Sequence, residues 1–302
     1  MDLDATRDDR YERIVHVISD MDPDVIAVQE ILGSTPYLAG DGLLQLAADT
    51  GLTCNTIQRP VYEDAARPAL ASAVNHERYD ERDVNRRRYH TGLMWRPGIA
   101  PVPGGWRHYS DGRDFWHSLA TLILDCGGPK IKVASFQGDP FRPDHRFNEA
   151  RRVVSAFRDR SIPGVIGMDA NGASSDRRAD GEFYDADYCV DATNFEDLVY
   201  QAEWNDDPDA PSVVDRRAAE VMRRGRLHDV APALAAPWEA TTGHWTGENG
   251  GTADPWGPRR IDHIRLTPHL LPGVRGYTAW RTPDSLRASD HLPVVVDFDL
   301  PQ

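Results

Sequence analysis

Polar residues able to do chemistry stand beside short apolar runs along this chain. The runs end or begin at Glu30, Gln137, Asp169 with Asn171, Asp262, and Asp290 with His291. Because each of these residues follows or enters a buried strand, we expect all of them to project into one cleft at one edge of a sheet. Four carboxylates meeting there would repel one another strongly unless a divalent cation neutralised them.

The ligand types in this set favour a hard cation. Oxygen ligands bind Mg²⁺ or Mn²⁺ in preference to zinc. One histidine, one asparagine and such a metal suit the attack of water on a phosphoryl group. In that chemistry the histidine or an aspartate activates the water, the asparagine holds an oxygen and the metal neutralises developing charge. The sequence therefore indicates phosphoryl-group hydrolysis.

A strongly basic segment, residues 82–90, lies inside an otherwise acidic chain. One interpretation is a solvated loop. The other is a loop on the substrate side, in which Arg86 and Arg88 offer guanidinium groups to a phosphate.

Elements that would position these residues can be read from the hydrophobic pattern. Helices are predicted over residues 9–21, 43–50, 148–158 and 216–225. Strands are predicted over residues 25–28, 91–95, 115–125, 131–136, 164–168 and 260–266, and from residue 289 onward. Residues 241–258, rich in glycine and tryptophan, are expected to form a loop.

The order of these elements favours two sheets packed face to face with helices outside them. Nothing along the chain reads as a repeat, a low-complexity tract or a linker. We therefore expect a single domain over residues 1–302.

The formal net charge of −14, from 48 acidic and 34 basic residues, limits the choice of partner. Tight binding to a nucleic acid needs a cationic surface, so tight binding of duplex DNA is not expected. A small-molecule phosphate ester or a nucleotide-like compound is the expected substrate.

The apolar runs, the N-terminal residues and the cysteines bear on the cellular location of the protein. It has no apolar run of about 18 residues, the length that would predict a transmembrane helix. The polar, acidic residues 1–7 do not have the pattern of a signal peptide. The scattered Cys54, Cys126 and Cys189 suit buried free thiols in a reducing compartment. A cytoplasmic location without membrane contact is expected.

Four stretches taken together carry a family resemblance. They are residues 23–30 (PDVIAVQE), 167–171 (GMDAN), 260–264 (RIDHI) and 289–293 (SDHLP). In this order they resemble the endonuclease/exonuclease/phosphatase family, which includes pancreatic-type deoxyribonuclease, apurinic endonucleases, neutral sphingomyelinases and inositol-polyphosphate 5-phosphatases. The resemblance covers residues from about 10 to 299. It implies a deoxyribonuclease-like α/β (α+β) fold, a four-layer sandwich of two packed, mostly antiparallel β-sheets flanked by helices.

Roles for the metal and water ligands follow from the resemblance. Glu30 would be the principal metal ligand, and Asp290 would lie beside the metal as a ligand or just behind one. Asp169 would position or deprotonate the attacking water. Asn171 would hold a phosphate oxygen.

The resemblance also implies roles for a histidine and for its carboxylate partner. His291 would touch the phosphoryl group, with Asp262 as its carboxylate partner. Gln137 stands where many family members have another histidine. Glutamine can donate a hydrogen bond to a phosphate oxygen but cannot act as a general acid.

A second departure from the family concerns the start of the chain. Family members usually begin with a strand that ends in asparagine, whereas residues 1–4 already resemble the stretch that follows it. We expect either a truncated start or an absent first strand. In the second case another segment or a partner chain, such as a homo-oligomer, would cover the gap.

Two hypotheses of function therefore stand. The first is a Mg²⁺-dependent phosphoesterase. The second is a divergent member that has lost this chemistry and binds a ligand or runs another reaction. His228, His244 and His263 are expected to be structural or to shape the substrate site. A zinc site built from His244, His263 and His291 has no supporting short spacing.

Overall fold

The computed structural model describes residues 9–56, 67–73, 88–110, 112–189, 198–203, 205–207, 210, 212–245 and 256–301. Two compact units divide the chain. The first unit consists of Met1–Gln137, Asp159–Met168 and Leu300–Gln302, and the second unit of Gly138–Arg158 and Asp169–Asp299. Each unit is described separately below.

The first unit opens with helix α1 (Asp9–Met21), at the bounds expected from the sequence. Its buried residues Ile14, Val17 and Ile18 recur at the spacing of one helix face. The helix ends where Asp22 takes a φ of 45° and its N–H returns to the Ile18 carbonyl at 3.2 Å. This left-handed residue closes the helix and turns the chain into the first strand.

Strand β1 (Val25–Gly33) pairs antiparallel with β5 (Arg88–Trp95), which in turn pairs with β4 (Leu70–Ala71). The strand expected to stop at Val28 therefore continues to Gly33. A register shift between Val28 and Ile31 separates the two parts of its ladder. A bulge of this kind interrupts the pattern of alternating side chains, so the second half of the strand is hard to predict.

A second sheet of the first unit has the strand order β10-β9-β8-β6, and β7 also pairs with β8. Its bounds are β6 (Ala100–Pro101), β7 (Arg107–Tyr109), β8 (Leu119–Asp125), β9 (Lys130–Gln137) and β10 (Gly164–Asp169). Strands β8 and β9 form an antiparallel hairpin, with Leu119 opposite Phe136 and Asp125 opposite Lys130. Gly127 supplies the positive φ of its turn, at 77°.

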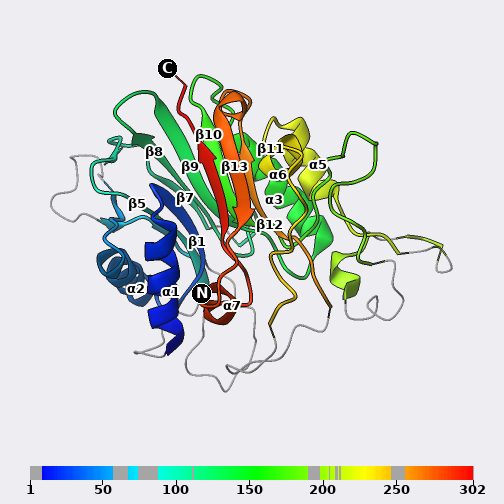
Figure 1. The fold of residues 1–302 in the computed structure, drawn as a ribbon, viewed down its shortest axis with the longest axis horizontal. Coiled ribbons are helices and arrows are strands. Elements are labelled where there is room, and N and C mark those ends of the chain that lie inside the picture. Colours follow the sequence, from blue (N-terminus) through cyan, green and yellow to red (C-terminus); the bar gives the residue numbers. More distant parts are fainter. Residues whose placement is uncertain are drawn as a thin grey trace. The chain divides into compact units, whose positions relative to one another are not determined.

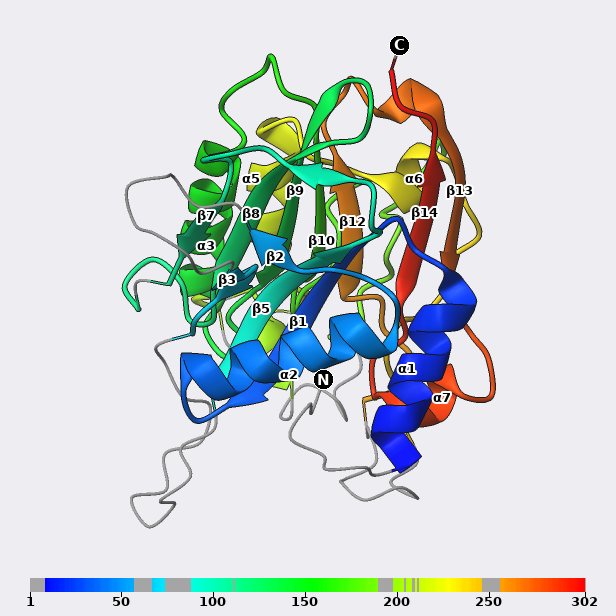
Figure 2. The same cartoon turned by 90° about the vertical axis from the view of Figure 1, so that its left-hand side faces the viewer.

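Buried hydroxyl groups join the two sheets of this unit. Ser135 on β9 donates to the Val28 carbonyl on β1 at 2.9 Å, and Ser118 donates to the Ala71 carbonyl at 2.8 Å. Helix α2 (Pro36–Asp49) covers the other face of the β1-β5-β4 sheet (Figure 2). It begins seven residues before the expected 43–50, because Thr35 caps it and Pro36 starts its first turn. A two-residue pair, β2 (Asn55–Thr56) with β3 (Arg67–Pro68), completes the described part.

In the second unit, α3 (Pro143–Ala156) packs against α5 (Arg217–Arg224), as Figure 1 shows. A Cβ on Gly225 would lie 2.4 Å from a methyl of Val154, so glycine permits this close approach. The expected helices 148–158 and 216–225 are both present, the first beginning earlier at Pro143. A buried cluster nearby consists of Ala173, Cys189, Leu198, Ala202 and Val214.

Strands of the second unit form two antiparallel pairs. Strand β11 (His228–Asp229) pairs with β12 (Asp262–Leu266), and β13 (Val274–Ala279) pairs with β14 (Val294–Phe298). Strand β13 was not expected from the sequence. Short elements α6 (Val230–Ala233), α7 (Ser285–Ala288), η1 (Val199–Gln201) and η2 (Leu271–Gly273) connect these strands.

The expected fold class is confirmed: the chain is mixed α/β, with antiparallel sheets flanked by helices. The single domain over residues 1–302 stays a prediction. Within the described ranges, no helix is long and apolar enough to cross a membrane. All three cysteines are free thiols, and Cys126, expected to be buried, is partly exposed.

Candidate active site

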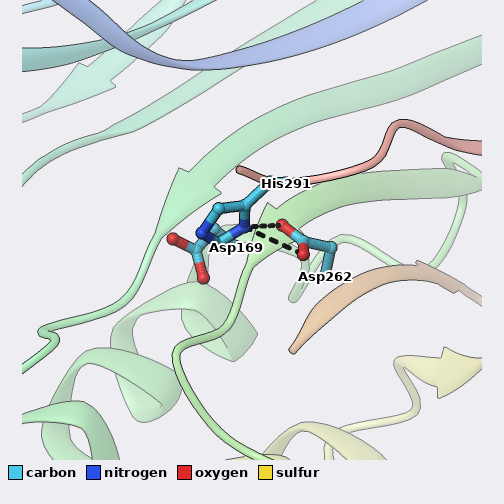
Figure 3. A group of neighbouring side chains, drawn as sticks. All are labelled: Asp169, Asp262 and His291. Atoms are coloured by element: carbon cyan, nitrogen blue, oxygen red, sulfur yellow. Dashed lines mark hydrogen bonds and ion pairs between the residues drawn. The ribbon is translucent and has the colours of Figure 1, made fainter. Parts of the chain in front are cut away.

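The second unit brings His291 and Asp262 into direct contact. Asp262 is the first residue of β12, and His291 lies three residues before β14. The imidazole Nδ1 is 3.0 Å from each oxygen of the Asp262 carboxylate, as Figure 3 shows. A carboxylate only accepts hydrogen bonds, so Nδ1 carries a proton and Asp262 fixes the orientation of the ring.

Asp169 and Asn171 form a tight turn at the end of β10. The Asn171 N–H donates to Asp169 Oδ1 at 2.9 Å, and its side-chain amide donates to Oδ2 at 3.2 Å and to the Gly138 carbonyl at 3.1 Å. Asn171 has a φ of 47°, a left-handed conformation that asparagine tolerates better than most residues. Both side chains are buried, so the turn presents a fixed carboxylate and a fixed amide.

These two pairs converge. Potential ligand atoms of Asp169, Asp262 and His291 all lie within 4.8 Å of one another. In Figure 3 the Asp262 carboxylate faces Nδ1 of the ring, and the Asp169 carboxylate lies at its opposite side. The chain around Asp169 is joined to the chain before Asp262, since the Ala170 N–H donates to the Ile261 carbonyl at 2.8 Å.

Charge around the ring sets its protonation. Burial alone would lower the pKa of His291. The ion pair and hydrogen bond with Asp262 raise it, and the charges of Asp169 and Asp290 raise it further. The net effect places the pKa of His291 well above its ordinary value. These carboxylates therefore favour the cationic form of the ring, in which both nitrogens donate hydrogen bonds.

A buried ion network anchors the strand that carries Asp262. The guanidinium of Arg260 lies 2.8 Å from Asp185 and 2.5 Å from Asp229, and all three side chains are at most 3% exposed. A buried arginine held by two carboxylates cannot shift without leaving charges unpaired. It fixes the start of β12 and with it the position of Asp262.

Gly138 is a neighbour of the Asp169 turn that sequence reasoning missed. Its N–H donates to the Asp169 carbonyl at 2.9 Å. A Cβ at this position would lie 2.8 Å from the Ala170 carbonyl oxygen. Only glycine allows this approach without displacement. The available signal was a glycine directly after a strand-end glutamine.

Glu30 and Gln137 are joined within the first unit, where the Gln137 amide donates to Glu30 Oε1 at 3.0 Å. Glu30 lies in the bulge of β1 with a φ of 56°. Bulges and left-handed residues other than glycine are concentrated at functional sites. The sequence located Glu30 but gave no sign of this backbone conformation.

Other predicted site residues have different surroundings. Asp290 is exposed and accepts a long hydrogen bond of 3.4 Å from the Ser289 hydroxyl. Arg88 is the first residue of β5, opposite Gly33. Arg86 lies outside the described residues. His263 is buried with Nε2 3.4 Å from the Arg260 carbonyl, and His244 contacts the Ser289 carbonyl at 3.0 Å.

Comparisons with known proteins place the fold. No protein-family model and no curated protein matches the sequence. Solved structures do match. One is an endonuclease/exonuclease/phosphatase from Beutenbergia cavernae DSM 12333, with a TM-score of 0.55, 20% identity, and 97% of this chain and 67% of that chain covered. The chain has the endonuclease/exonuclease/phosphatase fold.

Two further structures with this fold are similar over most of their length. One is the catalytic domain of human Nocturnin with a bound sulfate anion, with a TM-score of 0.57 and 14% identity. The match covers 96% of this chain and 86% of the Nocturnin chain. A mannosyl-6-phosphatase from Bacteroides thetaiotaomicron VPI-5482 has a TM-score of 0.53 at 14% identity, covering 96% and 91%. At these identities the likeness establishes the fold.

Proposed function

We propose that this protein is a divalent-metal-dependent hydrolase of phosphate esters. The observation that carries the proposal is the convergence of Asp169, Asp262 and His291 within 4.8 Å, with Asn171 bonded to Asp169. A cation, a fixed carboxylate and an amide are the groups that water attack on a phosphoryl centre requires. The fold supports the same reading, because proteins that share it include a phosphatase.

Each residue of the cluster has a role. Asp169 orients the attacking water and takes its proton. The Asn171 amide binds a phosphate oxygen by exchanging one of its two hydrogen bonds, to Asp169 or to Gly138, for the substrate. His291, held at Nδ1 by Asp262, donates from Nε2 to an oxygen on which negative charge develops. Asp262 keeps the ring oriented and charged.

The metal is proposed to be Mg²⁺ or Mn²⁺, held by Glu30 and Asp290. The donor set fits such a cation in kind: Glu30 is a carboxylate already accepting from an amide, and Asp290 is an exposed carboxylate. Hard divalent cations take oxygen ligands of this type. When bound, the cation would neutralise charge on a phosphoryl oxygen.

The proposed substrate is a small phosphate ester or a nucleotide-like compound. A net charge of −14 disfavours long duplex DNA. The similar mannosyl-6-phosphatase is named for a small sugar phosphate, which supports the same class. Gln137, Arg86 and Arg88 remain the proposed contacts to the substrate, and the nucleotide-like option rests on the charge argument alone.

Hydrolysis of bis-p-nitrophenyl phosphate and p-nitrophenyl phosphate tests this proposal. Activity should appear with Mg²⁺ or Mn²⁺ and disappear with EDTA. Asp169→Asn and His291→Gln should each lower kcat by about 100-fold or more. Matched controls are Asp180→Asn and His269→Gln, which change exposed residues of the same unit. Metal-independent turnover, or site variants as active as the controls, would overturn the proposal.

A second candidate is a protein that binds a phosphate ester without hydrolysing it, or uses it in another reaction. The observation favouring it is Gln137, which contributes an amide to Glu30 and no titratable ring. Saturable binding of a phosphate ester by calorimetry, with no turnover under any metal, would favour this candidate over the hydrolase.

A further inference from the structure

Thr241 contacts both arms of the His291–Asp262 pair, although it lies 21 residues before Asp262 and 50 before His291 in the chain. Its side chain is fully buried. The Thr241 hydroxyl oxygen is 3.2 Å from the N–H of Ile261 and 3.2 Å from the N–H of Asp262. The hydroxyl therefore accepts hydrogen bonds from the residue just before β12 and from Asp262, the first residue of β12.

The backbone of the same residue reaches the other arm. The Leu292 N–H, one residue after His291, donates to the Thr241 carbonyl at 2.8 Å. On the other side of His291, the Ser289 carbonyl lies 3.0 Å from Nε2 of His244. A carbonyl can only accept, so Nε2 of His244 is the protonated nitrogen. Residues 241–244 thus hold the chain on both sides of His291.

A hydroxyl that only filled space in the core would not show this pattern. The Thr241 hydroxyl oxygen accepts from the N–H groups of Ile261 and Asp262. The Thr241 carbonyl accepts from the N–H of Leu292, the residue that follows His291. Thr242 gives the contrast. Its hydroxyl is buried as well, but it donates to the Arg259 carbonyl, at 3.2 Å, and does not accept from an N–H group of β12.

We propose that Thr241 is a positioning residue for the candidate active site. Its hydroxyl fixes the backbone position of Asp262, and its carbonyl and the His244 ring fix the backbone on either side of His291. The 3.0 Å contact between His291 and Asp262 depends on both. This inference rests on the proposed hydrolase function for its kinetic consequence. Its structural content does not depend on that function. Small displacements of a catalytic group cost large factors in rate, so loss of the hydroxyl should be felt in kcat.

Three variants separate positioning from stability. Thr241→Val keeps the branched shape and removes the acceptor oxygen, whereas Thr241→Ser keeps the oxygen. We expect Thr241→Val to lower kcat about 10- to 100-fold, the range typical of groups that orient ligands, with KM little changed. Thr241→Ser should keep kcat close to that of the parent, because the acceptor oxygen is retained. Thr242→Val, the matched control, should resemble the parent.

A measurement independent of turnover completes the test. In ¹⁵N-histidine NMR spectra of the metal-free protein, the Nδ1–H signal of His291 should be shifted or broadened in Thr241→Val and unchanged in Thr241→Ser and Thr242→Val. If the parent hydrolyses no ester, this signal still decides the inference. A parental signal and parental kcat in Thr241→Val would overturn it and leave the hydrolase proposal standing.

The opposite arm offers a second pair if Thr241→Val does not fold. His244→Gln keeps a side-chain N–H for the Ser289 carbonyl, and His244→Leu removes it. The leucine variant should have a lower kcat and a shifted His291 Nδ1–H signal. The glutamine variant should keep most of the parental kcat and a nearly parental signal. Equal behaviour of the two variants would contradict the bracketing role of residues 241–244.

Discussion

At the scale of single residues, Asp262 decides what His291 can do. Both carboxylate oxygens lie 3.0 Å from Nδ1, so one side chain supplies orientation and charge together. Replacing the carboxylate with an amide keeps the shape and removes the charge. The ring then loses the partner that raises its pKa and stabilises it as a cation.

We expect Asp262→Asn to lower kcat for a p-nitrophenyl ester about 10- to 100-fold, because the amide orients the ring less strictly and does not stabilise its charged form. Steady-state kinetics with saturating Mg²⁺ is the measurement. Asp180→Asn serves as the control for removal of one carboxylate from the second unit. Unchanged kcat in Asp262→Asn would show that the pair has no part in turnover.

His90 is a residue whose effect appears in stability. It is completely buried on β5, where Nδ1 accepts from the Ala73 N–H at 2.8 Å and Nε2 lies 3.3 Å from the Gly33 carbonyl. The neutral ring with a proton on Nε2 satisfies both contacts, and a second proton would break the first. Burial lowers the pKa of His90 to about 4.

This lowered pKa predicts acid sensitivity. Between pH 6.5 and 4 the unfolded chain binds a proton at His90 that the folded chain does not, so the free energy of unfolding falls as the pH falls through this window. The loss is at most about 1.4 kcal/mol per pH unit. Urea unfolding at pH 7, 6 and 5 should show a shallower pH dependence for His90→Gln than for the parent. Equal slopes would contradict the assignment.

At the scale of elements, the turn after β10 depends on the close approach of Gly138. We expect Gly138→Ala to lower the free energy of unfolding by about 1–3 kcal/mol, because the new Cβ would lie 2.8 Å from the Ala170 carbonyl oxygen. The displaced turn should also lower kcat, since it carries Asp169 and Asn171. Thermal unfolding and ester hydrolysis give the two readouts.

Gly128→Ala is the matched control for this change. It replaces a glycine that has nothing within 4 Å of an added Cβ. Its stability and kcat should stay close to those of the parent. If both alanine variants behave alike, contact with Ala170 does not constrain the turn.

Sequence patterns were most informative where residue type and hydrophobic pattern coincide in a short stretch. The RIDHI and SDHLP stretches contain Asp262 and His291, whose side chains are in contact. The catalytic roles of both residues stay predictions. Thr241 was missed because its role depends on contacts across tens of residues, which no local pattern records. Strand β13 was missed for another reason: only Val274 and Ala279 of its six residues are buried, so its alternation is weak.

The backbone conformation around Glu30 was also not predicted from the sequence. The apolar run 25–28 predicts a strand that ends before Glu30, and the ladder in fact resumes at Ile31 after the bulge. A bulge costs one residue of register, and its position depends on the partner strand. The metal-site role of Glu30 stays a prediction, and so do the roles of Gln137, Asp290 and Arg88.

At the scale of the whole molecule, the charge of −14 governs encounters with other polyanions. We expect a short labelled DNA duplex to bind more weakly than about 10⁻⁴ M at physiological salt, because the charge of the protein repels the phosphate backbone. Fluorescence anisotropy measures this directly. Micromolar binding that weakens steeply with added salt would contradict the expectation and reopen nucleic acid as a substrate.

The division of the chain into two units has a consequence for its synthesis. The chain leaves the first unit after Gln137 and returns for residues Asp159–Met168, which contain most of β10. Until those residues emerge from the ribosome, one edge of β9 has no neighbouring strand and presents open backbone groups. A nascent chain that stalls before residue 168 would therefore expose this edge to pairing with other chains.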